Sequence, residues 1–149
     1  MAIEQMTPPE AKAAIDQDAN SILLDVRTEM EFAQGHPAGA INIPVAIPGP
    51  GGMQPNPEFM QVVEKVVAKD KSIFCSCAAG MRSQMAADRM AQAGYERLVN
   101  IQGGFGGLIQ NGVVMVKGWQ EEGLPVDTDV NDNNSYAGLK QNAGRVKRS

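Results

Sequence analysis

Short apolar runs alternate with helical patterns along this chain, and this alternation constrains the fold more than any other feature. The runs are rich in branched residues, as buried strands are, whereas the stretches between them place apolar residues at helical spacing. Such alternation predicts an α/β fold with a mostly parallel central sheet and helices on both of its faces. The predicted strands are 21–26, 39–44, 72–75 and 96–104, and the predicted helices are 8–16, 29–34, 58–69 and 83–94.

Several of these helices have recognisable ends and faces. Thr7 and Thr28 each precede a predicted helix and are followed three residues later by Glu10 and Glu31, which is the spacing of a capping box. Gly35 is expected to end the second of these helices. The predicted inward faces comprise Phe59, Val62, Val63, Val66 and Val67 in one helix, and Met85, Ala86, Met90 and Ala93 in another.

Segments rich in proline, glycine or asparagine interrupt the alternation. Residues 45–57 predict an irregular loop, and the pattern around Asn111-Gly112 predicts a small β-hairpin within 108–117. Beyond residue 127, asparagine is frequent and large apolar residues are rare, which predicts a disordered tail over 128–149. The remaining residues, 1–127, are expected to form one domain.

Charge and hydropathy exclude several classes of function. The net charge is −4 and basic residues are scattered until the C-terminal end, so no nucleic-acid surface is expected. No stretch approaches the ~20 apolar residues of a membrane span, and the first residues lack the pattern of a secretory signal. The two cysteines, Cys75 and Cys77, are too close in sequence to join distant elements, which favours a reducing compartment. We therefore expect a cytoplasmic protein without membrane or nucleic-acid partners.

The stretch CAAGMRS, residues 77–83, holds the strongest candidate for chemistry. It lies between a predicted strand and a predicted helix, at the end of the sheet where α/β folds place ligand sites. The loop amides, the start of the helix and Arg82 all favour an anion there, and such surroundings make a thiol ionise more readily. Cys77 is therefore predicted to be a nucleophile that solvent can reach. The alternative is a small buried side chain at the end of a strand.

The other cysteine is interpreted differently. Cys75 ends the apolar run 72–75 and is predicted to pack in the sheet, with a resolving thiol for oxidised Cys77 as the alternative. Cys75, Cys77 and His36 would supply only three ligands to zinc, so no metal site is predicted.

Three separated segments resemble a known family. CAAGMRS preceded by SIFCS, LLDVRTEMEFAQGHPAGAINIP upstream, and GGFGG followed by GWQEEGLPV downstream are similar to a single-domain rhodanese over about residues 5–127. The resemblance implies the rhodanese-like fold, no cofactor, and sulfurtransferase activity. In such an enzyme a small-molecule or protein donor passes a sulfane sulfur to a thiol acceptor through a persulfide on the loop cysteine, here Cys77.

The resemblance also implies roles for the loop residues. Their amides would surround the anionic persulfide, and the arginine would hold the charge of the donor or the product. Ser83 is expected to cap the following helix, with a hydrogen bond to the sulfur as the alternative. The implied loop comprises Ala78, Ala79, Gly80, Met81, Arg82 and Ser83.

Residues outside the loop are expected to support it. Asp25 and Arg27 would brace the loop, although Arg27 could also pair with Glu31 across a helix turn. The sole histidine, His36, and the sole tryptophan, Trp119, are expected to be structural. The glycines of 103–107 are expected to let the backbone pack closely beside the loop.

Two other functions compete with this one. A cysteine phosphatase would need a longer loop between Cys77 and Arg82 and a histidine in place of Ser76, so this class is excluded. A non-catalytic rhodanese-like module that binds a partner, or senses redox state through Cys75 and Cys77, remains the alternative.

Two departures from the commonest family pattern affect the expected activity. Ala78 and Ala79 replace residues that are often polar or cationic in members that prefer thiosulfate, which predicts weak thiosulfate activity. The hairpin within 108–117 lengthens the segment before Trp119, and it would either line the rim of the site or decorate the edge of the fold.

Overall fold

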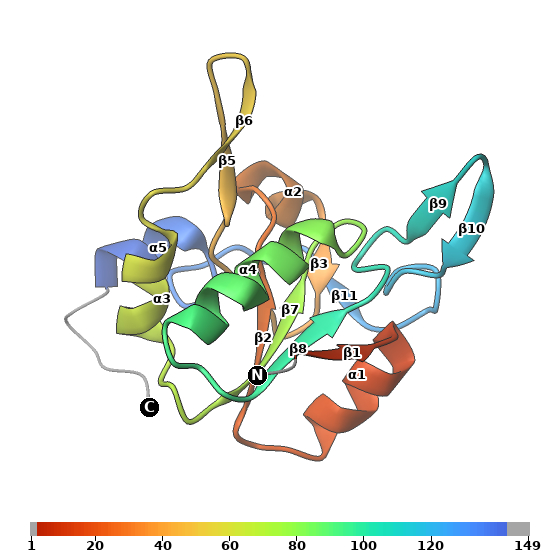
Figure 1. Ribbon diagram of the computed structural model, residues 1–149, viewed down its shortest axis with the longest axis horizontal. Coiled ribbons are helices and arrows are strands. Elements are labelled where there is room, and N and C mark those ends of the chain that lie inside the picture. The colour runs from red at the N-terminus through yellow and green to blue at the C-terminus, as the bar shows by residue number, and fades with distance from the viewer. Residues whose placement is uncertain (1–2, 143–149) are drawn as a thin grey trace.

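A parallel sheet forms the centre of the computed structural model, which describes residues 3–142 (Figure 1). Its strand order is β1-β8-β7-β2-β4, and every neighbouring pair is parallel. The α/β class predicted from the alternation is therefore confirmed. The strands are β1 (Glu4–Met6), β2 (Ser21–Asp25), β4 (Ile41–Asn42), β7 (Ser72–Ser76) and β8 (Leu98–Ile101).

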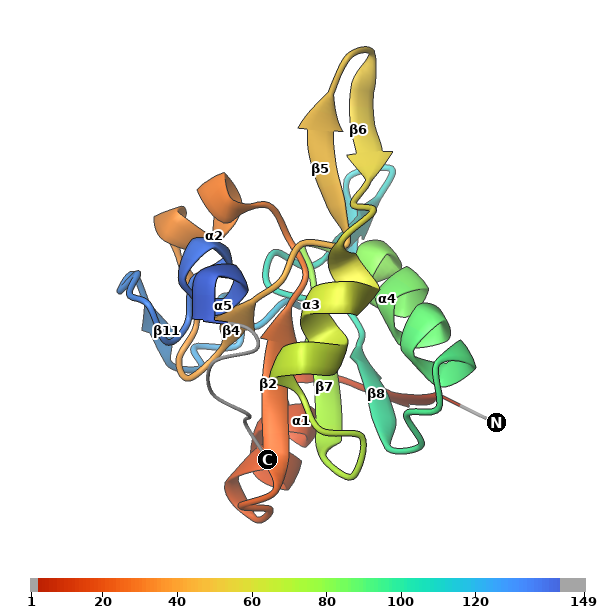
Figure 2. The same ribbon diagram turned by 90° about the vertical axis from the view of Figure 1, so that its left-hand side faces the viewer.

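Helices cover both faces of this sheet, as predicted. Alternate residues of β2 face opposite sides: Leu24 belongs to a core cluster with α3, α4 and α5, whereas Leu23 belongs to a second cluster with α1 and α2. Figure 2 shows α3 in front of the strands and α1 behind them. The helices are α1 (Pro8–Asp16), α2 (Glu29–Gln34), α3 (Phe59–Val66), α4 (Met81–Gln92) and α5 (Tyr136–Asn142).

The predicted capping boxes hold the first two helices in place. The Glu10 carboxylate accepts from the Thr7 backbone N–H at 2.9 Å, and Glu31 accepts from that of Thr28 at 3.1 Å. Helix α2 ends before Gly35, as the sequence predicts. The inward face of α3 is also confirmed, but Met85 of α4 is exposed, contrary to the prediction.

Two hairpins project from the end of the sheet at which β7 ends (Figure 1). The predicted hairpin comprises β9 (Leu108–Gln110) and β10 (Val113–Val116), and Asn111 and Gly112 between them both have positive φ. The prediction of an irregular loop over 45–57 is wrong, because this segment forms β5 (Ala46–Gly49) and β6 (Gly52–Pro55). A last antiparallel pair joins β3 (His36–Pro37) to β11 (Val126–Asp127).

The C-terminal segment is ordered over 128–142, so the prediction of a disordered tail is wrong there. Tyr136 and Leu139 of α5 are buried in the core beside α3. The asparagines build a turn before α5, where Asn134 donates to Asp129 and its backbone carbonyl accepts from the Asn42 N–H at 2.8 Å. The segment is mostly polar, and this composition led to the prediction of disorder, but two large apolar side chains hold it against the core. Residues 143–149, also part of that prediction, lie outside the described residues.

Within residues 3–142, no helix has the length and apolar character needed to cross a membrane.

Candidate active site

The loop after β7 directs a backbone amide at the sulfur of Cys77. Helix α4 begins at Met81, two residues before the predicted start, and Gly80 is its N-cap with a left-handed φ of 107°. This conformation suits glycine, and it brings the Gly80 N–H to 3.0 Å from Cys77 Sγ. The sulfur therefore receives a hydrogen bond at the positive end of a twelve-residue helix.

Ser83 contacts the sulfur instead of capping the helix. It lies in the first turn of α4, is fully buried, and places Oγ 3.3 Å from Cys77 Sγ. The expectation that Ser83 caps the helix is wrong, because Gly80 occupies that position. The structure instead shows the alternative, a contact between the Ser83 hydroxyl and the sulfur.

Cys77 is closed off from bulk solvent in this conformation. The residue is 1% exposed and belongs to the core cluster of α3, α4 and α5. The prediction of a nucleophile that solvent can reach is therefore wrong for this state of the protein. In this conformation bulk solvent has almost no access to the residue.

The glycine-rich segment after β8 supports the loop from behind, as predicted. The Phe105 N–H donates to the Cys77 carbonyl at 2.7 Å, and the Gly106 N–H donates to that of Ala78 at 2.8 Å. A Cβ at Gly104 would overlap the Cys77 carbonyl oxygen. Only glycine permits the two backbone segments to approach so closely.

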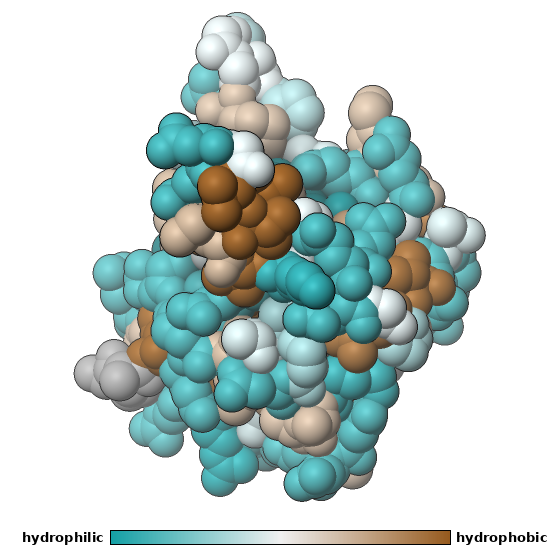
Figure 3. All heavy atoms as spheres, turned by 90° about the vertical axis from the view of Figure 1, so that its right-hand side faces the viewer, coloured by the Kyte–Doolittle hydropathy of each residue, from teal (hydrophilic) through white to brown (hydrophobic). Residues whose placement is uncertain are grey.

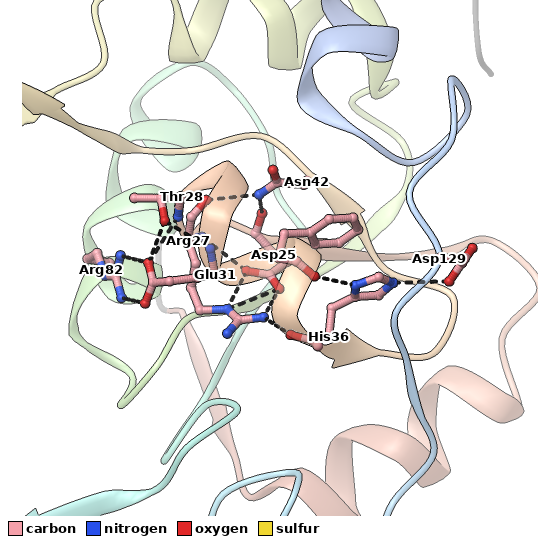
Figure 4. A network of polar contacts seen from close by, with 10 residues as sticks. Asp25, Arg27, Thr28, Glu31, His36, Asn42, Arg82 and Asp129 are labelled. Carbon is pink, nitrogen blue, oxygen red and sulfur yellow. Dashed lines mark hydrogen bonds and ion pairs between the residues drawn. The ribbon is translucent and has the colours of Figure 1, made fainter.

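Arg82 binds Glu31 of α2 and not the sulfur (Figure 4). Its guanidinium donates to the two carboxylate oxygens at 2.8 and 3.0 Å, a bidentate pair. The alternative in which Arg27 pairs with Glu31 is wrong. This ion pair lowers the pKa of Glu31 from its ordinary 4.5 to about 2, chiefly through the hydrogen bonds from Arg82.

Acid should weaken the fold partly through Glu31. Because its pKa is lower in the folded state, the ion pair contributes stability that is present above pH 4.5 and is lost as the pH falls toward about 2. Over this pH interval, Glu31→Gln should therefore lose less unfolding free energy than the unmodified protein does, as measured by urea titrations. The control is Glu122→Gln, an exposed carboxyl outside the ion pairs of the described residues. If Glu31→Gln and its control lose equal stability, the ion pair does not contribute in this way.

Asp25 and Arg27 form a buried ion pair at the end of β2 (Figure 4). Arg27 Nη2 lies 2.7 Å from Asp25 Oδ2 and also donates to the Gly35 carbonyl at 2.7 Å. Its guanidinium lies 4.6 Å from the ring centroid of Phe105, whose backbone supports Cys77. The pair therefore connects α2 to the segment behind the loop, which is the supporting position predicted for it, and neither residue hydrogen-bonds the sulfur.

Removing one partner of this pair should destabilise the protein strongly. Arg27→Met leaves the fully buried Asp25 without its partner, which should cost about 3–5 kcal/mol of unfolding free energy. Lys12→Met, which breaks the exposed pair with Asp16, should cost less than about 1 kcal/mol. Equal costs in urea unfolding would show that Arg27 does not brace the fold.

Cys75 and His36 have structural positions, as expected. Cys75 is fully buried in β7, and burial raises the pKa of its thiol to about 12. His36 stacks on Phe32 at 3.7 Å, and its ring nitrogens contact the Phe32 carbonyl and Asp129. Among residues 3–142, no three histidine, cysteine or acidic side chains are grouped to hold a metal ion. Trp119 is buried in the second core cluster.

One residue of the site was missed at the sequence level. Asn100 of β8 is 4% exposed, and its Oδ1 accepts from the Ser83 hydroxyl at 2.5 Å. A signal was present, because Asn100 is the one polar residue within the buried strand LVNI.

The β9–β10 hairpin reaches the loop that follows Cys77. Leu108 and Val116 at its base line a pocket of about 200 Å³ together with Ala79, Gly80 and Met81. Further out, Ile109, Val113, Val114 and Met115 are all exposed. Figure 3 shows hydrophobic residues gathered on this side of the molecule. A larger pocket of about 400 Å³ lies between α2, β5 and α5, and no loop residue lines it.

Several known proteins are similar to this chain in sequence or in fold. Residues 7–111 match the family model of the rhodanese-like domain. Thiosulfate sulfurtransferase 16, chloroplastic, of Arabidopsis thaliana is 35% identical over 116 residues, which are 76% of this chain and 97% of that protein. Thiosulfate sulfurtransferase GlpE of Haemophilus influenzae (strain PittEE) is 31% identical over 128 residues, 86% and 98% of the two chains. The crystal structure of Rv0390 from M. tuberculosis has a TM-score of 0.72 at 25% identity and covers 87% of this chain and 100% of its own.

Proposed function

This chain belongs to the rhodanese family, and from that premise we propose that it is a sulfurtransferase in which Cys77 carries the transferred sulfur as a persulfide. The observation that carries the proposal is the hydrogen bond from the Gly80 N–H to Cys77 Sγ at the start of α4. A donated amide proton at a helix N-terminus stabilises negative charge on sulfur. Two relatives that are named thiosulfate sulfurtransferases, at 35% and 31% identity, support the same activity.

The proposed reaction has two displacements at sulfur. The Cys77 thiolate attacks the outer sulfur of the donor, a new S–S bond forms, and the donor fragment leaves with the electron pair of the broken bond. An acceptor thiolate then attacks the outer sulfur of the persulfide. A new S–S bond forms between the acceptor and this outer sulfur, the bond between Cys77 Sγ and the outer sulfur breaks, and its electron pair returns to Cys77, which regenerates the thiolate.

The burial of Cys77 gives some support to the alternative function, a non-catalytic rhodanese-like module. A fully enclosed cysteine suits a non-catalytic module that binds a partner, since such a module needs no access to the thiol. Redox sensing through both cysteines has less support, because burial raises the pKa of Cys75 to about 12 and keeps that thiol protonated. Transfer of sulfur by the purified protein separates the two functions.

We expect the enzyme to prefer persulfide or polysulfide donors over thiosulfate. Ala78 and Ala79 carry no charge, and Arg82 is already bound to Glu31, so little positive charge is available to a doubly charged anion. With cyanide as the acceptor, kcat/KM for thiosulfate should be at least about tenfold below that for glutathione persulfide.

A variant that adds a positive charge to the loop provides the control for this donor preference. Ala79→Lys places an ammonium group in the wall of the pocket beside the loop, and it should raise kcat/KM for thiosulfate more than for glutathione persulfide. The donor prediction is wrong if the unmodified protein uses thiosulfate as well as it uses glutathione persulfide. No transfer from either donor would count against the sulfurtransferase itself.

Location in the cytoplasm stays a prediction. Both cysteines are free, as a reducing compartment requires, whereas two similar proteins are named as chloroplastic and one as mitochondrial.

A further inference from the structure

A continuous chain of hydrogen bonds runs from the sulfur of Cys77 to the protein surface. Ser83 Oγ lies 3.3 Å from the sulfur and donates to Asn100 Oδ1 at 2.5 Å. Asn100 Nδ2 donates to Gln5 Oε1 at 2.9 Å, and Gln5 Nε2 donates to Gln84 Oε1 at 2.6 Å. Gln84 Nε2 then donates to the exposed carboxylate of Asp88 at 3.2 Å.

The direction of every hydrogen bond in this chain follows from its outer end. The ionised carboxylate of Asp88 can only accept, so the amide of Gln84 turns its NH₂ group outward and its oxygen inward. Gln5 and Asn100 repeat that orientation, each donating outward. The inward-facing oxygen of Asn100 consequently takes the one proton that the Ser83 hydroxyl can donate.

This arrangement turns a hydrogen-bond acceptor toward Cys77. Because the Ser83 proton is used by Asn100, Ser83 Oγ can accept from a thiol S–H but cannot donate to a thiolate. Ser83 can donate to the thiolate only if it turns its proton to the sulfur, which leaves Asn100 Oδ1 buried without that donor. A buried acceptor that loses its partner opposes the change. The Gly80 N–H acts in the opposite direction, because it donates to the sulfur.

We propose that Asn100 is a positioning residue that holds the Ser83 hydroxyl away from Cys77 and so opposes the ionisation that the Gly80 N–H favours. Asn100 touches neither the sulfur nor a substrate, and it acts only through Ser83. The other titratable groups around the thiol are Cys75 on β7, Asp25 on β2, and Arg82 on α4 with its partner Glu31 on α2. None of these hydrogen-bonds to Asn100, so a substitution there leaves their ion pairs in place.

Two substitutions of Asn100 with opposite expected effects test this proposal. Leucine has nearly the same size and no acceptor, so Asn100→Leu frees the Ser83 proton for the sulfur. The pH at which Cys77 becomes reactive toward iodoacetamide, followed by intact mass, should fall by about one to two pH units. Asn100→Asp keeps the acceptor and adds a negative charge, so its midpoint should rise. A merely structural role of Asn100 would not move the two midpoints in opposite directions.

A Ser83→Ala background completes the test. Without the hydroxyl, Asn100→Leu should leave the midpoint of the reactivity profile unchanged, because Ser83 is the proposed intermediary. The proposal is overturned if Asn100→Leu alone leaves the midpoint in place or raises it, or if its shift persists in Ser83→Ala. Any effect of Asn100 on catalysis rests on the proposed sulfurtransferase function. The alkylation test does not, because iodoacetamide reacts with the thiol without any sulfur transfer. A protein without transferase activity can therefore still show the shift, and the two failures are distinguishable.

Discussion

Cys77→Ser should lower sulfur transfer by at least about a thousandfold, to the rate of the reaction without enzyme. A serine hydroxyl fits the same position beside Gly80 and Ser83 but is not ionised at neutral pH and cannot hold a sulfane sulfur. The measurement is kcat/KM with glutathione persulfide as donor and cyanide as acceptor. Circular dichroism and urea unfolding should show that the variant remains folded.

The matched control for this variant is the neighbouring cysteine. Cys75→Ala removes a thiol that is fully buried in β7, in the strand that precedes the loop. It should lose some stability and keep transfer within a few-fold of the unmodified protein. If Cys77→Ser retains a large part of the activity, or if Cys75→Ala loses it, the sulfur is carried elsewhere.

Gly104→Ala should have a large effect on folding stability. The added Cβ would overlap the Cys77 carbonyl oxygen and would lie 2.8 Å from its carbonyl carbon, and both are backbone atoms. The φ of +51° adds strain for any residue with a side chain. Overpacking and strain together should cost about 3 kcal/mol or more of unfolding free energy. Transfer should also fall, because relief of the clash displaces the loop.

A second glycine separates steric overlap from backbone strain. Gly112 in the turn of the β9–β10 hairpin has a φ of +77°, and a Cβ added there would meet no atom within 4 Å. Gly112→Ala should therefore cost only the strain, about 1 kcal/mol, and leave transfer unchanged. Equal losses of stability for the two variants in urea titrations would show that the contact with Cys77 is not what requires Gly104.

Local sequence signals predicted the features that depend on neighbours in the chain. The capping boxes at Thr7 and Thr28, and the turn at Asn111-Gly112, were recognisable because each uses residues within four positions. The close packing of 103–107 was predictable because paired glycines have few other roles in a strand-to-loop transition. Family resemblance then placed these elements in one fold.

Features that depend on distant partners escaped prediction. The pairing of Arg82 with Glu31 joins residues 51 positions apart. Strand β1 has two exposed residues in EQM, and only its pairing with β8 makes it a strand. The segment 128–142 is polar, yet Tyr136 and Leu139 anchor it beside α3. Cys77 is likewise buried in a core cluster to which α3, α4 and α5 contribute, and no local pattern reveals this burial.

The enclosure of Cys77 gives the proposed function a specific requirement. Because the residue is 1% exposed in the described conformation, we expect the loop or a neighbouring segment to open before a donor reaches the sulfur. The β9–β10 hairpin lies next to this loop and shares the pocket formed by Ala79, Gly80 and Met81. The hairpin therefore lies beside the loop, whereas a role in partner selection stays a prediction.

Intact mass of the protein after incubation with polysulfide tests the central claim most directly. We expect a gain of one sulfur atom on Cys77, which cyanide removes and which Cys77→Ser does not acquire. A folded protein that gains no sulfur, or whose added sulfur persists in Cys77→Ser, would contradict the claim that this cysteine carries the transferred sulfur.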